Sequence, residues 1–403
     1  MGKEQFYNSV TCQVSDLKNL AGIQAALCFD TDRLRQALPE ETGRKIKRVI
    51  ITGCGDSYSA AGAMLPGFKL LSGLPKCNAP DIMDFCHFYP EEKIRKGFRM
   101  EEVLLVAVSF SGGSARIVDA LKRAESLGAE TLLITRYPES AGGQAAGHVF
   151  GVDTPEGCNT PGLRSYYASM VGLAALGAFI GLCNGTVDGE RFRQVKEQIV
   201  SYTERFMEDF EVIDDQMFAE AERMKALTRF EVIADGNEGF SAQFVEEKMI
   251  ECSGVYCDHT NSEEFAHISY MYRRPGEFGT IVMIQEKDPS FGRMKDTIIG
   301  ALAQHRPTLI VTDADPDRFA FDPKIPDMPF EMPVIGYNSR AAAGKPAFCR
   351  IAKAPEPWMT PLVDFIPGSL LAGYHAAVNE KKYFGGRYDF RTQEWMEGQG
   401  GED

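Results

Sequence analysis

A loop of hydroxyls and glycines follows the apolar run at residues 103–108 and passes directly into an amphipathic stretch. Its members with a possible chemical role are Ser109, Ser111, Gly112 and Ser114. In a strand–loop–helix unit such a loop lies at the helix N-terminus, where free backbone N–H groups and the helix dipole favour an anion. The pattern therefore predicts a cradle for a phosphate-like group on a small ligand.

A second glycine-rich turn occurs earlier, in Gly53-Cys54-Gly55-Asp56-Ser57-Tyr58. It begins like a dinucleotide-binding motif but lacks the third glycine, and the chain has no Gly-Lys-Ser/Thr phosphate loop. A nicotinamide or nucleotide cofactor is therefore not expected at this turn. Alone, the turn is equally typical of a tight strand-to-helix connection with Ser57 as the helix cap. Together with the serine loop, it adds Gly55 and Ser57 to the predicted cradle.

Two residues in the second half have side chains suited to proton transfer. Glu251 ends a mixed-character helix expected over 244–251, and His267 follows sixteen positions later. Taken alone, Glu251 is most simply a solvated helix charge and His267 an ordinary loop histidine. A catalytic role for them needs further support.

Composition excludes several classes of protein. The 403 residues, 44% of them hydrophobic and 25% charged, allow two ordinary soluble domains, and the net charge of -14 argues against nucleic acid as a partner. The ten cysteines form no CxxC pair and no secretory leader follows Met1, so we expect a cytoplasmic protein with reduced thiols. The six histidines are scattered, so no metal site is expected.

An apolar stretch over residues 166–183 approaches the length of a membrane span. It is isolated and rich in glycine and alanine, and loop-like sequence precedes it. We therefore expect a helix buried in a large core or a dimer interface, and no membrane partner.

The chain repeats itself, and the repeat predicts its organisation. The matching segments are 51–60 with 233–242, 104–108 with 280–284, and 131–135 with 308–312. Strand, loop and helix alternate through both halves, which predicts two doubly wound α/β domains with mostly parallel sheets, joined near residues 185–210. Ligands of such folds bind beyond the carboxyl ends of the strands, where both candidate loops lie.

These motifs resemble those of the SIS (sugar isomerase) domain family, in the tandem arrangement of the isomerase half of glucosamine-6-phosphate synthase. The resemblance runs from about residue 45 to about residue 375, and extends to the fructosamine-6-phosphate deglycases. It implies two flavodoxin-like SIS domains. The expected parts are a helical N-terminal segment 1–44, a first SIS domain 45–190, a second 205–380 and a tail 381–403.

The resemblance also implies which residues hold the substrate. The turn at Gly53 looks like the family's Gly-Cys-Gly-Thr-Ser-Tyr, and the loop at Ser109 looks like its Ser-x-Ser-Gly-x-Thr, whose hydroxyls hold a sugar 6-phosphate. That role carries over to Ser57, Ser109, Ser111 and Ser114, while Phe110 replaces a glutamine. Arg164 falls where the family has a Thr-Lys-Ser/Ala-Phe segment, so it either faces the site or forms a surface ion pair.

Glu251 and His267 have the spacing of the family's catalytic glutamate and histidine, and Glu264 matches a further glutamate that could orient His267. The Gly-Pro that usually follows the histidine is replaced by Ile268-Ser269. The resemblance implies that His267 opens the sugar ring and that Glu251 moves a proton between C1 and C2 through an enediol or enolamine. We expect partial burial to raise the pKa of Glu251, and no metal or other cofactor is needed.

Three functions remain open. The first is an aldose–ketose isomerase for a sugar with a C6 phosphate or sulfonate, the second a ketosamine 6-phosphate deglycase, and the third a non-catalytic sugar-phosphate sensor. The chain has no N-terminal cysteine nucleophile, so no release of ammonia from glutamine is expected. The synthase has a catalytic lysine in its C-terminal tail. In the tail of this chain we expect either that Lys381, Lys382 or Arg387 takes that role, or that the tail is a docking segment. The resemblance also implies a homodimer with shared active sites.

Overall fold

The computed structural model describes residues 2–319 and 346–385, which fall into two compact units. The first unit contains residues 16–204, and the second contains residues up to 15 together with those from 205 to 385. The expected N-terminal segment 1–44 is thus divided between the two units. Of the expected tail, residues 386–403, including Arg387, lie outside the described residues.

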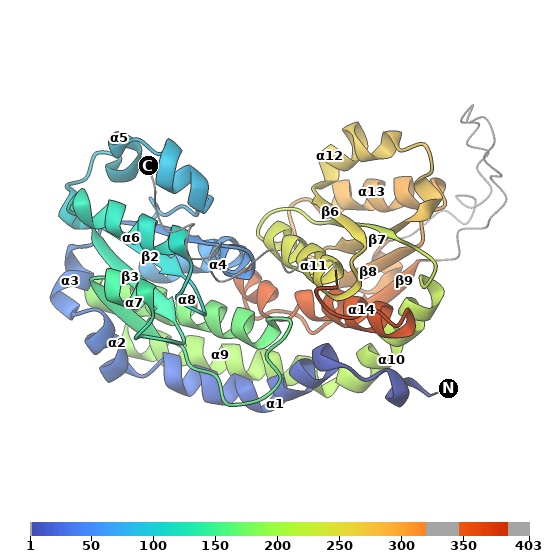
Figure 1. The fold of residues 1–403 in the computed structure, drawn as a ribbon, viewed down its shortest axis with the longest axis horizontal. Coiled ribbons are helices and arrows are strands. Elements are labelled where there is room, and N and C mark those ends of the chain that lie inside the picture. Colours follow the sequence, from blue (N-terminus) through green and yellow to red (C-terminus); the bar gives the residue numbers. More distant parts are fainter. Residues whose placement is uncertain (1, 320–345, 386–403) are drawn as a thin grey trace. The chain divides into compact units, whose positions relative to one another are not determined.

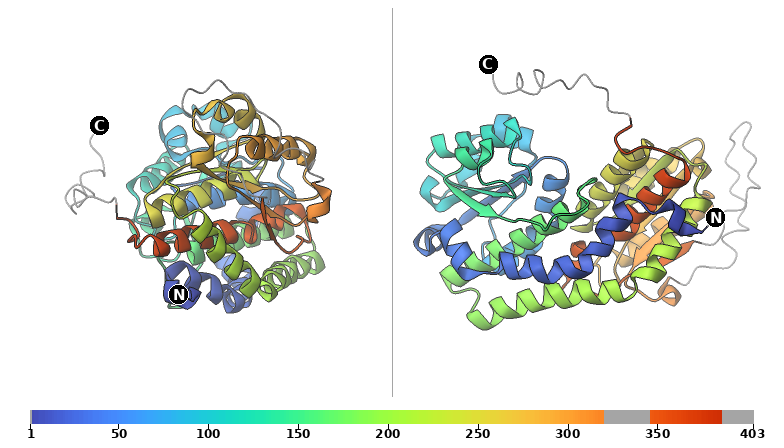
Figure 2. Two further views of the ribbon diagram at one scale, coloured as in Figure 1. Left: turned by 90° about the vertical axis from the view of Figure 1, so that its right-hand side faces the viewer. Right: turned by 60° about the horizontal axis from the view of Figure 1, so that its bottom comes forward.

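The first unit is a parallel sheet with helices on both faces (Figures 1 and 2). Its strands follow the order β1-β2-β3-β4, and a parallel bridge between Ile50 and Asn78 continues the sheet beyond β1. Helices α6 and α7 contact one face, and α4 and α8 pack together on the other. The strands are β1 (Arg48–Gly53), β2 (Val103–Val108), β3 (Glu130–Thr135) and β4 (His148–Gly151). The helices are α2 (Thr31–Ala37), α3 (Glu40–Lys45), α4 (Asp56–Ser72), α5 (Glu91–Arg95), α6 (Ala115–Ser126), α7 (Ala141–Ala145) and α8 (Leu163–Asn184), while α1 (Ser9–Cys28) and α9 (Gly189–Glu208) contain the two unit boundaries.

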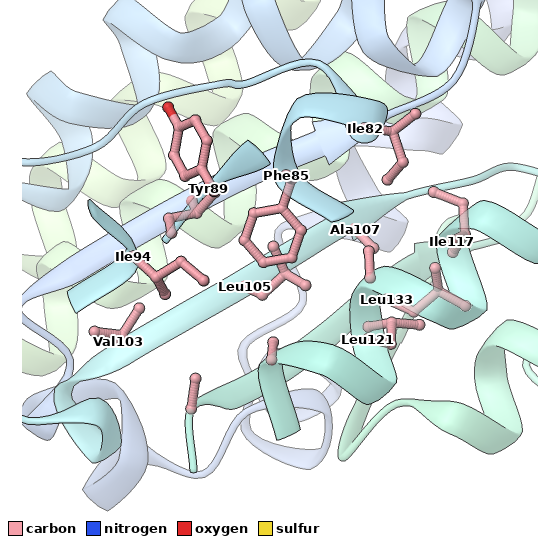
Figure 3. Packing of buried hydrophobic residues seen from close by; sticks show 14 residues of the cluster. Ile82, Phe85, Tyr89, Ile94, Val103, Leu105, Ala107, Ile117, Leu121 and Leu133 are labelled. Atoms are coloured by element: carbon pink, nitrogen blue, oxygen red, sulfur yellow. The ribbon is translucent and has the colours of Figure 1, made fainter. Parts of the chain in front are cut away.

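A hydrophobic cluster fixes α6 against the sheet. Phe85, from the short helical turn Asp84–Phe88, packs with Leu105 of β2 and with Ile117 and Leu121 of α6 (Figure 3). Every residue of β2 is buried, which explains its unbroken apolar sequence, because a parallel strand covered on both faces has no solvent side. The cluster therefore holds the serine loop, which joins β2 to α6, in a defined place.

Helix α8 contains the long apolar stretch. By length and composition it could cross a membrane, but 89% of its apolar window is buried inside the structure. It packs closely on α4, where the Cα of Gly181 leaves no room for a side chain next to the Leu71 carbonyl. The expectation of a buried core helix is confirmed. All ten cysteines are free thiols, and a cytoplasmic location stays a prediction.

We expect Gly181→Ala to destabilise the first unit by about 1–3 kcal/mol, the usual cost of overpacking a core. A Cβ at this position would lie 2.0 Å from the Leu71 carbonyl oxygen, so α4 and α8 must move apart. Gly22→Ala is the matched control, because a Cβ there meets nothing within 4 Å on an exposed face of α1. Chemical denaturation measures the free energy of unfolding of both variants. Equal stability of the two variants would contradict the close contact.

The second unit has the same architecture. Its parallel strands follow the order β6-β5-β7-β8-β9, with α10, α11 and α14 packed together on one side of the sheet and α12 and α13 on the other (Figure 1). The strands are β5 (Arg229–Ile233), β6 (Tyr256–Thr260), β7 (Phe278–Met283), β8 (Thr308–Thr312) and β9 (Ala347–Arg350). The helices are α10 (Phe210–Arg223), α11 (Glu238–Ser253), α12 (Ser262–His267), α13 (Phe291–Ala303) and α14 (Phe365–Val378).

The predicted repeat and the doubly wound parallel α/β fold are confirmed. Ile51 of β1 pairs with Val106 of β2, and Ile233 of β5 pairs with Val282 of β7, as the sequence match requires. Helices α6 and α13 begin at matching positions. The segment 285–290 of the second unit therefore takes the place that the serine loop has in the first.

Candidate functional site

A pocket of about 280 Å³ lies at the carboxyl ends of β1 and β2 in the first unit. We call it the serine pocket. Its lining residues are Cys54, Asp56, Ser57, Ser109, Phe110, Ser111, Ser114, Ser165, Tyr166 and Ser169. All four serines that the sequence predicted are among them, so the two loops that lie 50 residues apart in the chain form one site.

The first turn owes its shape to two glycines. Gly55 has a φ of 52°, in the left-handed region, and directly precedes α4. A Cβ on Gly53 would lie 2.7 Å from the backbone of Ser57, so only glycine lets the strand end turn this tightly into the helix. The turn brings the first residues of α4, including Ser57, to the pocket wall.

The serine loop is held by its own hydrogen bonds. The Ser109 hydroxyl accepts from the Gly112 amide at 3.1 Å, and Gly112 has a φ of 65°. A Cβ on Gly112 would lie 2.0 Å from the Ser140 hydroxyl oxygen, so this position also requires glycine. Ser114 occupies the N-cap of α6 but makes no capping hydrogen bond with its side chain. Its hydroxyl therefore remains at the pocket, next to the first N–H groups of the helix, where an anion is favoured.

Helix α8 supplies a third wall that the sequence analysis did not identify. Ser165 and Ser169 line the pocket one turn apart, and Tyr166 lies between them. The two serines are four positions apart and share a helix face, which the spacing alone could have shown. Asp56 also lines the pocket and adds one negative charge to a site otherwise rich in hydroxyls.

Arg164 contacts other residues. Its side chain is buried and donates to the carbonyls of Pro155 at 2.7 Å and Cys158 at 3.4 Å, and it lies 3.6 Å from a carboxylate oxygen of Asp16. The guanidinium thus ties down the loop that precedes α8. It is neither part of the pocket lining nor an exposed ion pair, and both expectations for Arg164 are corrected accordingly.

At the carboxyl ends of its strands, the second unit has acidic residues where the first unit has serine hydroxyls. Glu238, in the first turn of α11, and Asp364, at the N-cap of α14, are buried, and Asp288 lies in the segment that replaces the serine loop. Burial raises the pKa of Glu238 and of Asp364 well above the ordinary values, and the charge of Asp288 adds to both shifts. Carboxyl groups thus stand where the first unit has serine hydroxyls, so the side chains at this end of the sheet do not duplicate the anion cradle.

Glu251 lies near the end of α11 and forms an ion pair with Lys248, whose side chain is fully buried. The ammonium group lies 4.7 Å from the centre of the Phe244 ring. With 30% of its side chain exposed, Glu251 is anchored by a buried cation and is not a freely solvated helix charge. The raised pKa expected for it stays a prediction.

His267 is the last residue of α12, and 74% of its side chain is exposed. Its Nε2 lies 3.5 Å from a carboxylate oxygen of Glu263, one helical turn earlier. Glu264, the expected orienting residue, is exposed, and its amide donates to the Asn261 side chain at 2.9 Å. The carboxylate beside His267 is therefore that of Glu263, which also binds Arg293 at 2.8 Å.

Two comparisons of sequence bear on this geometry. Residues 44–180 match the model of the SIS domain. The glutamine–fructose-6-phosphate aminotransferase (isomerizing) of Xylella fastidiosa is 27% identical over 166 residues, which is 40% of this chain and 26% of that protein. The enzyme of the same name from Gloeobacter violaceus is 27% identical over 168 residues, 41% of this chain and 26% of that protein. The match thus spans about a quarter of these relatives.

Solved structures show the same fold over nearly the whole chain. The C-terminal domain of glucosamine-fructose-6-phosphate aminotransferase from Francisella tularensis has a TM-score of 0.72 at 13% identity, covering 94% of this chain and 98% of that one. A Clostridium difficile protein provisionally described as a phosphosugar isomerase has a TM-score of 0.72 at 15% identity, covering 97% and 99%. Glucosamine-6-phosphate deaminase from Thermotoga maritima has a TM-score of 0.62 at 14% identity, covering 93% and 96%.

Proposed function

We propose that this chain, a SIS-domain protein by its residues 44–180, is an aldose–ketose isomerase for a sugar with an anionic group at C6. The observation that carries the proposal is the serine pocket. Ser165 and Ser169 of α8 line it with hydroxyls that donate to the carbonyls of Gly162 and Ser165, whereas the hydroxyls of the two loops meet there beside the beginnings of α4 and α6. Such a set of donors suits a tetrahedral oxyanion, with phosphate first and sulfonate second.

The size of the pocket agrees with a small ligand. A volume of about 280 Å³ lies just below the usual range for small-molecule sites and is larger than a phosphate or sulfonate group. The anion would bind next to the two loops, several bonds away from the reacting carbons of the sugar. Binding energy at the anion would then orient the distant C1 and C2 for reaction.

Glu251 and His267 would carry out the chemistry on those carbons. In the proposed sequence the C1–O5 bond breaks as His267 donates a proton to the ring oxygen and the C1 hydroxyl releases its proton to solvent. Glu251 then takes the C2 proton of the open-chain aldose, which gives an enediol once the C1 oxygen is protonated. The proton returns from Glu251 to C1 as the C2 hydroxyl loses its own proton and becomes the ketone. The ion pair with buried Lys248 supports the role of Glu251, because a general base must be held in one place. Two of the similar proteins are an isomerizing glutamine–fructose-6-phosphate aminotransferase and a glucosamine-6-phosphate deaminase, and their names agree with chemistry at these carbons.

The exposure of His267 supports a dimer with shared sites. His267, Ile268 and Met271 are all largely exposed, and they lie within five consecutive residues. An exposed histidine next to exposed apolar side chains is poorly placed for catalysis unless another surface covers it. A second copy of the chain is the proposed cover, and it would bring His267 to the substrate of its partner.

We expect Met271→Glu to shift the protein from dimer to monomer and to reduce turnover by at least about tenfold, because a charge replaces a buried apolar contact at the interface. The side chain is 70% exposed in the single chain, so the fold itself should tolerate the change. Sedimentation velocity measures the assembly state. Val212→Glu, at another exposed apolar residue, is the control. A monomeric wild-type protein with full activity would exclude the shared site.

The proposal has a direct test. The protein is incubated in heavy water with hexose 6-phosphates, hexose 6-sulfonates and fructosamine 6-phosphates. Deuterium appearing at the carbon beside the carbonyl, without release of an amine, is the result expected of an isomerase. Release of an amine would instead identify the alternative activity, a deglycase acting on ketosamine 6-phosphates. Binding without turnover of any compound would identify a sensor.

A further inference from the structure

A second depression lies at the opposite end of the strands of the second unit, where β5, β6 and β7 begin. Its volume is about 430 Å³. We call it the arginine–tyrosine depression. It is lined by Arg229, Tyr256, Tyr272, Arg273, Arg274 and Phe278. None of these residues has a part in the proposed reaction, and neither Ile268 nor Met271 lines the depression.

The aromatic floor of the depression is rigid. The rings of Tyr272 and Phe278 stack with their centres 4.5 Å apart and their planes at 15°. Beneath them lies the fully buried guanidinium of Arg306, 5.8 Å from the Tyr272 ring and 5.3 Å from the Phe278 ring. Arg306 is in turn fixed by an ion pair with buried Glu231. Rings held in this way offer a preformed face on which a planar ligand can stack.

The rim carries an excess of positive charge. Arg229 and Arg274 both contact a single carboxylate, that of Glu277, each at 3.3 Å. Arg273 is exposed, and within residues 2–319 and 346–385 no ion pair is found for it. The depression therefore has three guanidinium groups and one contacting carboxylate, although the net charge of the whole chain is -14.

These two properties select a ligand that is both planar and anionic. A guanidinium group binds two oxygens of a phosphate through two parallel hydrogen bonds. Aromatic rings and arginine side chains stack on nucleobases. Tyr256, 55% exposed, offers a ring at the rim that a base could cover. Inorganic phosphate would leave the aromatic floor unused, and an uncharged ring would leave the excess positive charge of the three arginines without an added anion. The volume is within the range of small-molecule sites.

We propose that the arginine–tyrosine depression binds a nucleoside phosphate, with the base stacked against Tyr256 and Tyr272 and the phosphate held by Arg273 and Arg274. The site goes beyond the proposed isomerase function and lies at the strand edge opposite to the one where α/β folds bind substrates. It uses neither of the glycine-rich nucleotide motifs, because stacking and arginine forks replace the phosphate loop.

Titration calorimetry on the full chain tests the proposal, with AMP, GMP and UMP as probes. At least one nucleotide should bind with a Kd below 1 mM, on the order of ligands held by one stack and one charge pair. Adenosine alone and inorganic phosphate alone should each bind at least about tenfold more weakly, because each loses one of the two interactions.

Variants locate the binding. Arg273→Ala and Tyr256→Ala should each weaken nucleotide binding by about tenfold or more, since each removes one recognition element from an exposed position. Arg44→Ala, an exposed arginine of the first unit, is the control and should change nothing. Nucleotide affinity that is unchanged in both variants, or absent in the wild type, would overturn the proposal. Equal affinity for inorganic phosphate would show a simple anion site, and tighter binding of a single-stranded oligonucleotide would show a nucleic-acid surface; both results would also overturn it.

Discussion

Glu251→Gln is expected to lower turnover by about 10²–10⁴-fold, the usual contribution of a general base, while sugar-phosphate binding stays within about twofold. Glutamine has the same shape but cannot accept the C2 proton. Binding should persist because the anion is held in the serine pocket of the first unit, to which Glu251 does not belong. Deuterium exchange and calorimetry with the same sugar phosphate measure the two effects separately.

Two further variants distinguish a loss of catalysis from a loss of folding stability. Glu251→Gln removes the ion pair between Glu251 and the buried ammonium of Lys248, which by itself destabilises the helix. Glu251→Asp retains the charge and shortens the side chain by one methylene, so it should fold normally and still lose activity. Glu246→Gln changes another glutamate of α11, one paired with His259, and should remain active. A fully active Glu251→Gln protein would remove Glu251 from the mechanism.

The second unit is expected to lose stability as the pH rises. Burial raises the pKa of Glu238 and Asp364 in the folded state, while both groups have ordinary values in the unfolded chain. Below the unfolded pKa both states are protonated and the stabilising contribution is complete. Above it the unfolded chain releases protons that the folded unit retains, so the free energy of unfolding falls by up to about 1.4 kcal/mol per pH unit for each proton, until the folded pKa is passed.

Asp364→Asn should weaken this dependence, because an amide has no proton to lose. Its stability relative to wild type should increase from pH 5 to pH 8. Fluorescence of Trp358, buried in the second unit, reports the unfolding transition during denaturation. Glu101→Gln, an exposed carboxyl of the first unit, is the control and should follow wild type at every pH. A stability difference between Asp364→Asn and wild type that stays constant across this range would show that Asp364 does not retain its proton.

The strands, the repeat and the serine loops could be predicted from the sequence because each is a local pattern. Residues 103–108 are apolar throughout since both faces of β2 are covered, and Gly55 and Gly112 precede helices at positive φ. Such features depend only on neighbours along the chain. This is why the four serines of the pocket are predictable from the sequence.

The residues that sequence reasoning misplaced or did not identify depend on distant partners. Arg164 is directed to Pro155 by the course of a loop, which its motif does not encode. Glu238, Asp288 and Asp364 come from three separate segments, so their common burial is visible only in the fold. The partner of His267 is an exception. Glu263 lies four positions before it, and the regular spacing of a helix already favoured Glu263 over the residue that family resemblance selected.

The close approach of α4 and α8 links the interior of the first unit to ligand affinity. Both helices begin at the serine pocket, one with Asp56 and Ser57 and the other with Ser165, and both press together deeper down at Gly177 and Gly181. The distance between α4 and α8 at Gly177 and Gly181 therefore affects the width of the serine pocket at the other end of the two helices. If the proposed function holds, a methyl group added at Gly181 would weaken binding of the sugar's anion as well as the fold of the first unit. Selection on substrate size would then act through residues that do not touch the substrate.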